Sequence, residues 1–114
     1  MKLIVKDIVG PNAISMQSGH LLYEQIDKTI LAGEHVELDF EGVSLFASPF
    51  FNASIGFLLK DINVDDLKSR LVILNISEVG RQLLNHAIAN AIKFYQKLED
   101  QEEQIKIINK NAED

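Results

Sequence analysis

Short strand-like runs alternate with longer helical runs along the whole chain, and this order constrains the fold more than any other feature. Strand-like patterns, recognised by alternation or by continuous β-branched and apolar residues, cover residues 2–8, 35–40 and 71–74. Apolar residues at three- and four-residue steps predict helices over residues 15–32, 48–61 and 77–98. Because strands that alternate with helices pair in parallel through right-handed crossovers, we expect an α/β fold of βαβαβα order. Its central sheet is predicted to be mainly parallel, with the helices packed on it.

The hydrophobic pattern also predicts which residues form the core. The continuous apolar run of residues 71–74 is typical of a central strand between helical layers. We expect burial of Leu38, Phe40, Val72, Ile73, Leu84 and Ile88. The core face of the last helix is predicted to comprise Val79, Leu83, Leu84, Ala87, Ile88, Ala91, Ile92, Tyr95 and Leu98.

Capping residues and polar segments set the predicted boundaries. Ser48, followed by Pro49, suits the cap of the middle helix, and Ser77 suits the cap of the last one. Residues 65–69 are polar and are predicted to form a connection. The polar end from residue 99 to residue 114 is expected to fray, within a single domain of residues 1–114.

Composition and charge narrow the classes of partner. The 114 residues are 46% hydrophobic and 25% charged, as in ordinary folded domains, and the formal charge is -6. A surface of that sign repels nucleic acid and anionic lipid, so neither is an expected partner. The absence of cysteine excludes thiolate chemistry and suits a reducing compartment. With no signal peptide or membrane-spanning run in the sequence, a cytoplasmic location is expected.

The usual sequence signs of catalysis and cofactor binding are missing. The six glycines are too scattered to form a phosphate-binding loop, so no cofactor is predicted. His20, His35 and His86 are far apart in sequence and form no metal-binding motif. We therefore predict neither a metal site nor an enzyme.

Function in parallel sheets gathers at the carboxyl ends of strands, which directs attention to residues 41–49. Asp39 is predicted to support this loop by accepting backbone hydrogen bonds. The alternative is that Asp39 acts as a general base or a ligand. Gly42 is a second predicted supporting residue of the same loop. Ser44 and Ser48 are candidate contact residues. Phe50 and Phe51 are adjacent on one helix, and we expect one of these rings to face outward as a partner-binding anchor.

The segment from Val36 to Phe51, which reads VELDFEGVSLFASPFF, resembles the central strand, loop and helix of STAS domains. It is most similar to the STAS-like family of unknown function, whose members carry a similar "LDFEGV" phrase. STAS domains of the anti-sigma-factor-antagonist type bind a kinase-like ATPase, and phosphorylation of a serine in a D-S-S-G or D-S-x-G phrase breaks that complex. In this chain Ala47 replaces the Asp, while Pro49 and Phe50 replace the second Ser and the Gly. Ser48 matches the first Ser, so the resemblance implies that Ser48 is the candidate phosphoacceptor.

Three hypotheses for function follow from these observations. The first is a non-catalytic regulatory module that docks a protein partner, such as a histidine-kinase-like ATPase, through the loop and helix of residues 41–56. The second is a small-molecule sensor or enzyme with its site at the strand ends, for which the sequence offers only Asp39, Ser44 and Ser48. The third is a structural homo-oligomer that uses the long last helix as a packing face.

Overall fold

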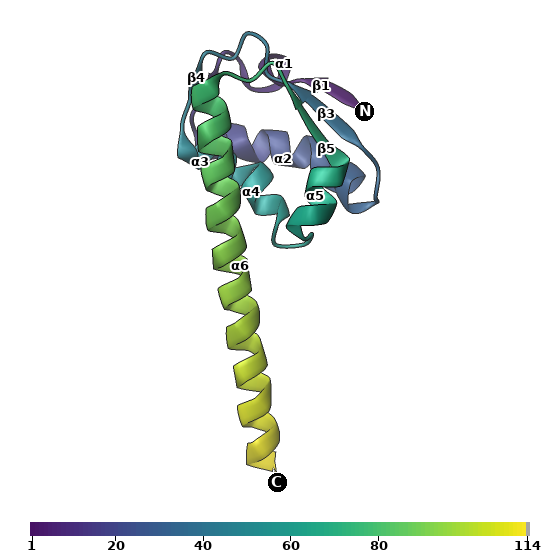
Figure 1. The fold of residues 1–114 in the computed structure, drawn as a ribbon, viewed down its shortest axis with the longest axis vertical. Helices are drawn as coiled ribbons and strands as arrows, with labels where there is room; N and C mark the ends of the chain where they lie inside the picture. Colours follow the sequence, from purple (N-terminus) through teal and green to yellow (C-terminus); the bar gives the residue numbers. More distant parts are fainter. Residues whose placement is uncertain (114) are drawn as a thin grey trace.

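A three-stranded parallel sheet forms the centre of the molecule. The computed structural model describes the backbone of residues 1–113 and the side chains of residues 1–98 (Figure 1). Strand β3 (Val36–Asp39) lies between β1 (Lys2–Ile4) and β5 (Leu71–Leu74), and both neighbours run parallel to it. Helices pack against this sheet, so the predicted α/β class with a parallel sheet is confirmed. The element order is longer than the predicted βαβαβα, because additional short helices and a two-stranded pair interrupt it.

The first strand is shorter than its β-branched sequence predicts. The strand predicted over residues 2–8 ends at Ile4, and a short helix, α1 (Val5–Val9), follows directly. Burial explains the difference, because Val5 is fully buried and helix α1 packs against the next helix. Gly10, at a φ of 81°, ends α1 and donates its backbone N–H to the carbonyl of Lys6. Tertiary packing here overrides local strand propensity.

The last strand lies at an edge of the sheet and not at its centre. Leu3, Leu38 and Ile73 stand in register on one face, and Lys2, Glu37 and Val72 stand in register on the other. Leu38 is buried, whereas Lys2 and Glu37 are exposed and Val72 is 42% exposed. Helices therefore cover only one face of the sheet. The predicted burial of Val72 is wrong, and Ile73 is only half-buried, because an edge strand with one open face needs no continuous apolar burial.

Helix α2 (Met16–Leu31) matches the predicted helix of residues 15–32. Ser15 caps it by accepting a 3.0 Å hydrogen bond from the backbone N–H of Ser18. The core side of α2 consists of buried Leu22, Tyr23, Ile26 and Ile30. A Cβ built on Gly19 would lie 2.3 Å from the carbonyl oxygen of Phe50, so the absence of a side chain lets α2 approach the next helix backbone closely.

The predicted helix of residues 48–61 is two short helices. Helices α3 (Ser48–Ala53) and α4 (Ile55–Leu58) are separated by Ser54, whose φ and ψ are −108° and −94°. The buried Ser54 hydroxyl donates a 2.8 Å hydrogen bond to the carbonyl of Phe50 at this break. Ser48 is the first residue of α3 and not its cap; Ala47 occupies the cap position and provides no side-chain hydrogen bond.

The polar connection predicted at residues 65–69 is helical. Helix α5 (Val64–Arg70) is capped by Asn63, whose side-chain oxygen accepts a 2.8 Å hydrogen bond from the N–H of Asp66. Acidic residues occupy the first turn of α5 and basic residues the last, an order that favours the helix dipole. Only Leu67 is buried, which is why no apolar periodicity marked this helix in the sequence.

The last helix, α6 (Glu78–Glu113), extends far past the rest of the molecule (Figure 1). Ser77 caps it as predicted, accepting a 3.1 Å hydrogen bond from the N–H of Gly80. Within the predicted core face, Leu84 and Ala87 are buried, while Leu83, Ile88, Ala91 and Tyr95 are half-buried. Val79, Ile92 and Leu98 are exposed, so that part of the prediction is wrong: the rest of the molecule covers a narrower and shorter stripe of α6 than the apolar pattern predicts. The expected fraying concerns residues 99–114, whose side chains lie outside the described residues, and it stays a prediction.

Candidate functional site

The loop that leaves the carboxyl end of β3 begins with a tight turn. The backbone N–H of Val43 donates a 3.0 Å hydrogen bond to the carbonyl of Phe40. Gly42 has a φ of 83°, a conformation that favours glycine. Its bare α-carbon also faces Lys6, because an added Cβ would lie 2.8 Å from the Cδ of that lysine. Gly42 therefore sits where the sequence predicted a supporting residue of the loop.

A second, two-stranded parallel pair holds the loop on its far side. Strand β4 (Leu45–Phe46) pairs with β2 (Asn12–Ala13). The backbone N–H of Ser44 donates to the carbonyl of Pro11 at 2.8 Å, and that of Ala47 donates to the carbonyl of Ala13 at 3.0 Å. Hydrogen bonds to one neighbouring segment thus fix the backbone at both ends of β4.

Asp39 joins the carboxyl ends of two strands to the start of the loop. Its Oδ1 accepts hydrogen bonds from the backbone N–H of Glu41 at 2.9 Å and from the side-chain amide of Asn75 at 3.0 Å. The Asn75 bond, followed by the Glu41 bond, holds the pKa of the Asp39 carboxyl below its usual value; desolvation opposes them and Lys2 contributes a smaller lowering. These bonds suit the predicted loop-supporting role of Asp39 better than that of a general base.

Asn75 is a residue of this site that the sequence reasoning missed. It follows β5 directly and has a φ of 55°, a left-handed conformation that asparagine tolerates better than most residues. An asparagine immediately after a strand is the signal that could have identified it.

Four aromatic rings pack beneath the loop. Phe51 is stacked on Phe46 with ring centroids 5.7 Å apart and meets Phe50 edge-on at 5.2 Å, and Phe40 contacts both Phe46 and Phe51. Phe50 and Phe51 are both fully buried, so the expectation that one ring faces outward is wrong. The reason is that α3 packs against α2 on one side and α6 on another, so two faces of this short helix are covered.

The exposed part of the loop is a short segment that we call the 44–49 ridge, comprising Ser44, Leu45, Ser48 and Pro49. Leu45 is 55% exposed, Ser44 and Pro49 are exposed, and Ser48 is partly exposed. Leu45 was also missed by the sequence reasoning. Strand alternation provides the signal, because neighbours on a strand point to opposite faces and Phe46 packs inward. The structure thus brings Ser44 and Ser48 to one exposed segment, with Phe50 and Phe51 beneath it.

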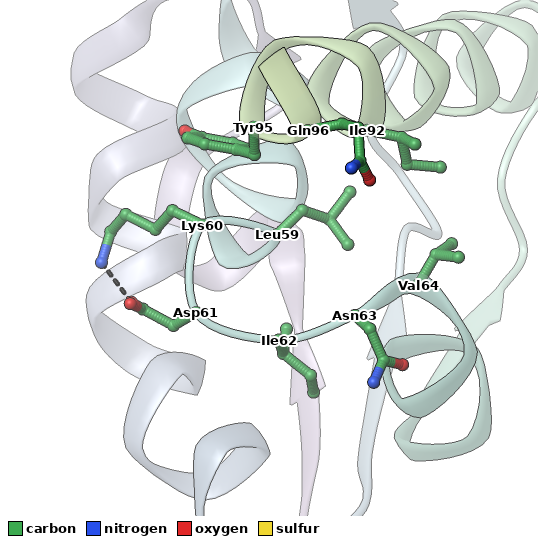
Figure 2. A pocket seen from close by; sticks show the side chains of 9 residues that line it. All are labelled: Leu59, Lys60, Asp61, Ile62, Asn63, Val64, Ile92, Tyr95 and Gln96. Carbon is green, nitrogen blue, oxygen red and sulfur yellow. Dashed lines mark hydrogen bonds and ion pairs between the residues drawn. The ribbon is translucent and has the colours of Figure 1, made fainter. Parts of the chain in front are cut away.

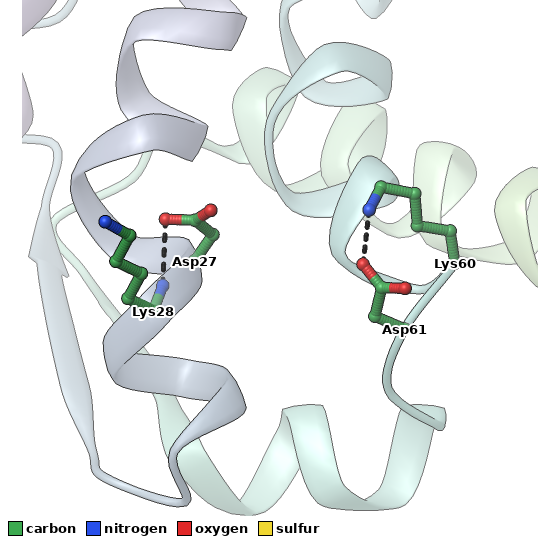
Figure 3. Close-up of polar contacts among 4 residues, drawn as sticks. All are labelled: Asp27, Lys28, Lys60 and Asp61. Carbon is green, nitrogen blue, oxygen red and sulfur yellow. Dashed lines mark hydrogen bonds and ion pairs between the residues drawn. The ribbon is translucent and has the colours of Figure 1, made fainter.

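A separate pocket lies between the α4–α5 connection and α6, as Figure 2 shows. Its volume is about 340 Å³, and residues 59–64 together with Ile92, Tyr95 and Gln96 line it. Lys60 forms an ion pair with Asp61 at its rim (Figure 3), and the Lys60 ammonium lies 4.8 Å from the ring centroid of Phe57. Figure 3 also shows Asp27 accepting a 2.8 Å hydrogen bond from the backbone N–H of Lys28 on α2. The α4–α5 connection leads into α5, which precedes β5, and the pocket shares no lining residue with the 44–49 ridge.

Ionisable side chains that could ligate a metal do not cluster within the part of the chain that the structure describes. His20 pairs with Glu24 on the exposed face of α2 at 3.0 Å, and His35 and His86 are exposed on other elements. Among the described residues, no helix combines the length and the apolar character needed to cross a membrane.

Comparison with known families identifies the group to which this chain belongs. The family model of the STAS-like domain of unknown function matches residues 18–81, which is more than half of the 114 residues. The matched region contains all but the first two residues of α2, together with β3, the 44–49 ridge and β5. No curated protein and no solved structure matches the chain significantly. The chain is therefore a member of the STAS-like domain family of unknown function.

Proposed function

We propose that this protein is a non-catalytic regulatory module that binds a protein partner through the 44–49 ridge. The observation that carries the proposal is the exposure of Leu45, 55% of whose surface is open to solvent, on a segment whose backbone is hydrogen-bonded at both ends. An exposed apolar side chain beside exposed hydroxyl groups combines an anchor for a partner's apolar pocket with a polar rim.

The rigidity of the ridge supports this proposal. Pairing with β2 fixes its backbone from one side, and the partly buried ring of Phe46 and the fully buried rings of Phe50 and Phe51 support it from below. A surface that is ordered before binding loses little conformational entropy when a partner docks. Phe50 and Phe51 then contribute to binding as the support of the ridge and not as direct contacts.

The partner class comes from the family resemblance. The kinase-like ATPases that bind STAS domains of the anti-sigma-factor-antagonist type are the first candidates, and Ser48 is the proposed phosphoacceptor. A phosphate on Ser48 would add negative charge within the ridge, next to Pro49 and close to Leu45 along the chain. Modification of this serine is therefore proposed to weaken the complex without unfolding the domain.

The absence of catalysis is part of the proposal. The Oδ1 atom of Asp39, the candidate acid at the strand end, already accepts two structural hydrogen bonds. The 340 Å³ pocket is lined by residues 59–64 and by α6, with no residue from the strand ends, so it gives the sensor or enzyme hypothesis no support there. Turnover in a broad hydrolase and phosphatase screen, abolished by Asp39→Ala in a folded variant, would contradict this part.

Leu45→Glu tests the docking surface, with Val72→Glu as its matched control. Both residues are exposed apolar strand residues, at 55% and 42%, but Val72 lies on the open face of the main sheet. Partners are captured from cells that express the protein, purified, and measured by calorimetry against each variant. We expect Leu45→Glu to weaken binding on the order of 100-fold and Val72→Glu to leave it unchanged. A partner that binds the Leu45→Glu variant as tightly as the native protein would refute the ridge as the interface.

A further inference from the structure

Helix α6 continues far beyond the body that supports its first half. It contains 36 residues, which corresponds to a length of about 54 Å. The α4–α5 connection faces α6 at Ile92, Tyr95 and Gln96, which line the pocket of Figure 2. Figure 1 shows the helix running past this point with no other element beside it. Helices gain most of their stability from tertiary packing of an apolar face, so a packing partner would stabilise the projecting half of α6.

Two large apolar side chains are exposed where α6 leaves the body. Phe94 is 56% exposed and Leu98 is 40% exposed. The sequence continues their spacing at steps of three and four residues, with Gln101, Ile105 and Ile108. This is a heptad pattern in which Leu98 and Ile105 take position a, and Phe94, Gln101 and Ile108 take position d. Four of these five positions are apolar, and the polar Gln101 at a core position is a type of residue that specifies register.

We propose that the projecting half of α6 forms a parallel two-stranded coiled coil with the same segment of a second copy of this chain. The charges at the flanking positions favour this occupant and this orientation. Lys97 takes position g and Glu102 takes position e of the following heptad. In a parallel pair the g residue of one helix faces the next e residue of its partner, so Lys97 of each copy meets Glu102 of the other. In an antiparallel pair g positions face g positions and e positions face e positions, so Lys97 would not meet Glu102 and this attraction would be lost.

The proposed dimer is independent of the 44–49 ridge. The ridge lies beside the amino-terminal end of α6, where a Cβ built on Gly80 would lie 3.0 Å from the ring of Phe46. The heptad positions begin more than three turns further along the helix, at Phe94. Loss of the dimer and loss of partner binding are therefore separable by experiment.

Leu98→Glu tests the seam of the proposed coiled coil, which is the line of a and d positions, and Ile92→Glu is its matched control. Both residues belong to α6 and each is 40% exposed, but Ile92 takes heptad position b, outside the seam. The full chain is measured by sedimentation equilibrium from about 1 μM to about 1 mM, a range in which weak and moderate dimers dissociate. We expect a dimer whose dissociation constant rises on the order of 100-fold in Leu98→Glu and stays unchanged in Ile92→Glu. A monomer throughout the range, or a dimer that Leu98→Glu leaves intact, would overturn the proposal.

Orientation is tested with charge reversal and with a single cysteine. Lys97→Glu should weaken the dimer, and the double variant Lys97→Glu with Glu102→Lys should restore it. The native chain has no cysteine, so Leu98→Cys introduces the only thiol, and mild oxidation should link two copies because identical a positions face each other in a parallel pair. Dimers in which Leu98→Cys fails to cross-link, or which the double variant fails to restore, would rule out the parallel arrangement.

Discussion

The side-chain amide of Asn75 donates a 3.0 Å hydrogen bond to the carboxylate of Asp39, and this bond ties the end of β5 to the end of β3. The same carboxylate oxygen accepts from the backbone N–H of Glu41, the first step of the loop that leads to the 44–49 ridge. The residue pair thus connects the main sheet, the start of the loop and the segment that leads into α6.

Two substitutions of Asn75 separate its hydrogen bond from its backbone conformation. Asn75→Gly removes the amide but tolerates the φ of 55°, whereas Asn75→Ala removes the amide and adds left-handed strain. We expect both variants to be less stable than the native protein, and the alanine variant to be less stable than the glycine variant by about 1 kcal/mol. Urea denaturation measures the free energy of unfolding of each protein and so gives their order of stability. Equal stability of the two variants would show that the positive φ costs nothing.

The lowered pKa of Asp39 predicts a pH dependence of stability at the acid end. A carboxyl whose pKa is lower in the folded state stabilises the fold above its unfolded pKa, about 4, and this contribution is lost as the pH falls through the folded pKa. The urea midpoint of the native protein should therefore fall more steeply below about pH 4 than that of Asp39→Asn. NMR titration of the carboxyl in Asn75→Gly should show its pKa moving up toward the usual value, because the largest cause of the lowering is gone. An unchanged Asp39 pKa in that variant would show that the Asn75 hydrogen bond is not the main cause of the lowering.

Adjacent residues on β5 test which face of the sheet is covered. Ile73 packs against the core, and Val72 lies on the open face. Ile73→Asp places a charge against apolar neighbours and should lower the free energy of unfolding by about 2–4 kcal/mol. Val72→Asp should lower it by no more than about 1 kcal/mol, mainly through strand propensity. If thermal and urea unfolding rank the two variants in the opposite order, the assignment of the covered face is wrong.

Ser48→Asp tests the proposed control of partner binding. Ser48 is partly exposed, and no hydrogen bond of its hydroxyl occurs within the described part of the chain. An added carboxylate should therefore leave the circular dichroism spectrum and thermal midpoint unchanged while weakening the partner complex on the order of tenfold. Ser48→Ala is the control, since it removes the hydroxyl without adding charge and should bind normally. Equal loss in both variants would indicate that the hydroxyl itself is the contact.

Strong periodic patterns predicted the main elements, because long buried faces leave a clear trace in sequence. The bounds of helix α2, the bounds of strand β3 and the start of α6 at its Ser77 cap agree with their predictions to within one residue. The break at Ser54 was not predictable in this way, since the apolar spacing continues unchanged across it while the backbone turns. The position of β5 in the sheet was also not predictable, because an apolar run fits an edge strand with one covered face as well as a central strand.

The sequence predicted the place of the 41–49 loop in the fold more closely than it predicted the contacts of the loop's residues. Asp39 and Gly42 occupy supporting positions in the loop, and Ser44 and Ser48 lie on its exposed side. The buried state of Phe50 and Phe51 depends on α2 and α6, which both pack against α3, a long-range arrangement that local spacing does not encode. Asn75 joins the site from a segment 36 positions away from Asp39, so only the fold brings it there.

The central place of β3 in the sheet also determines the order in which the chain can fold. Lys2 pairs with Glu37 and Val36 pairs with Leu71, so each edge strand reaches β3 only by closing a loop of about 35 residues. No two strands of this sheet can form a local hairpin, and β1 is synthesised well before β3, the strand with which it pairs. Such non-local pairing slows folding relative to a helical bundle of the same size. The amino-terminal strand must therefore wait, unpaired, until β3 has been synthesised.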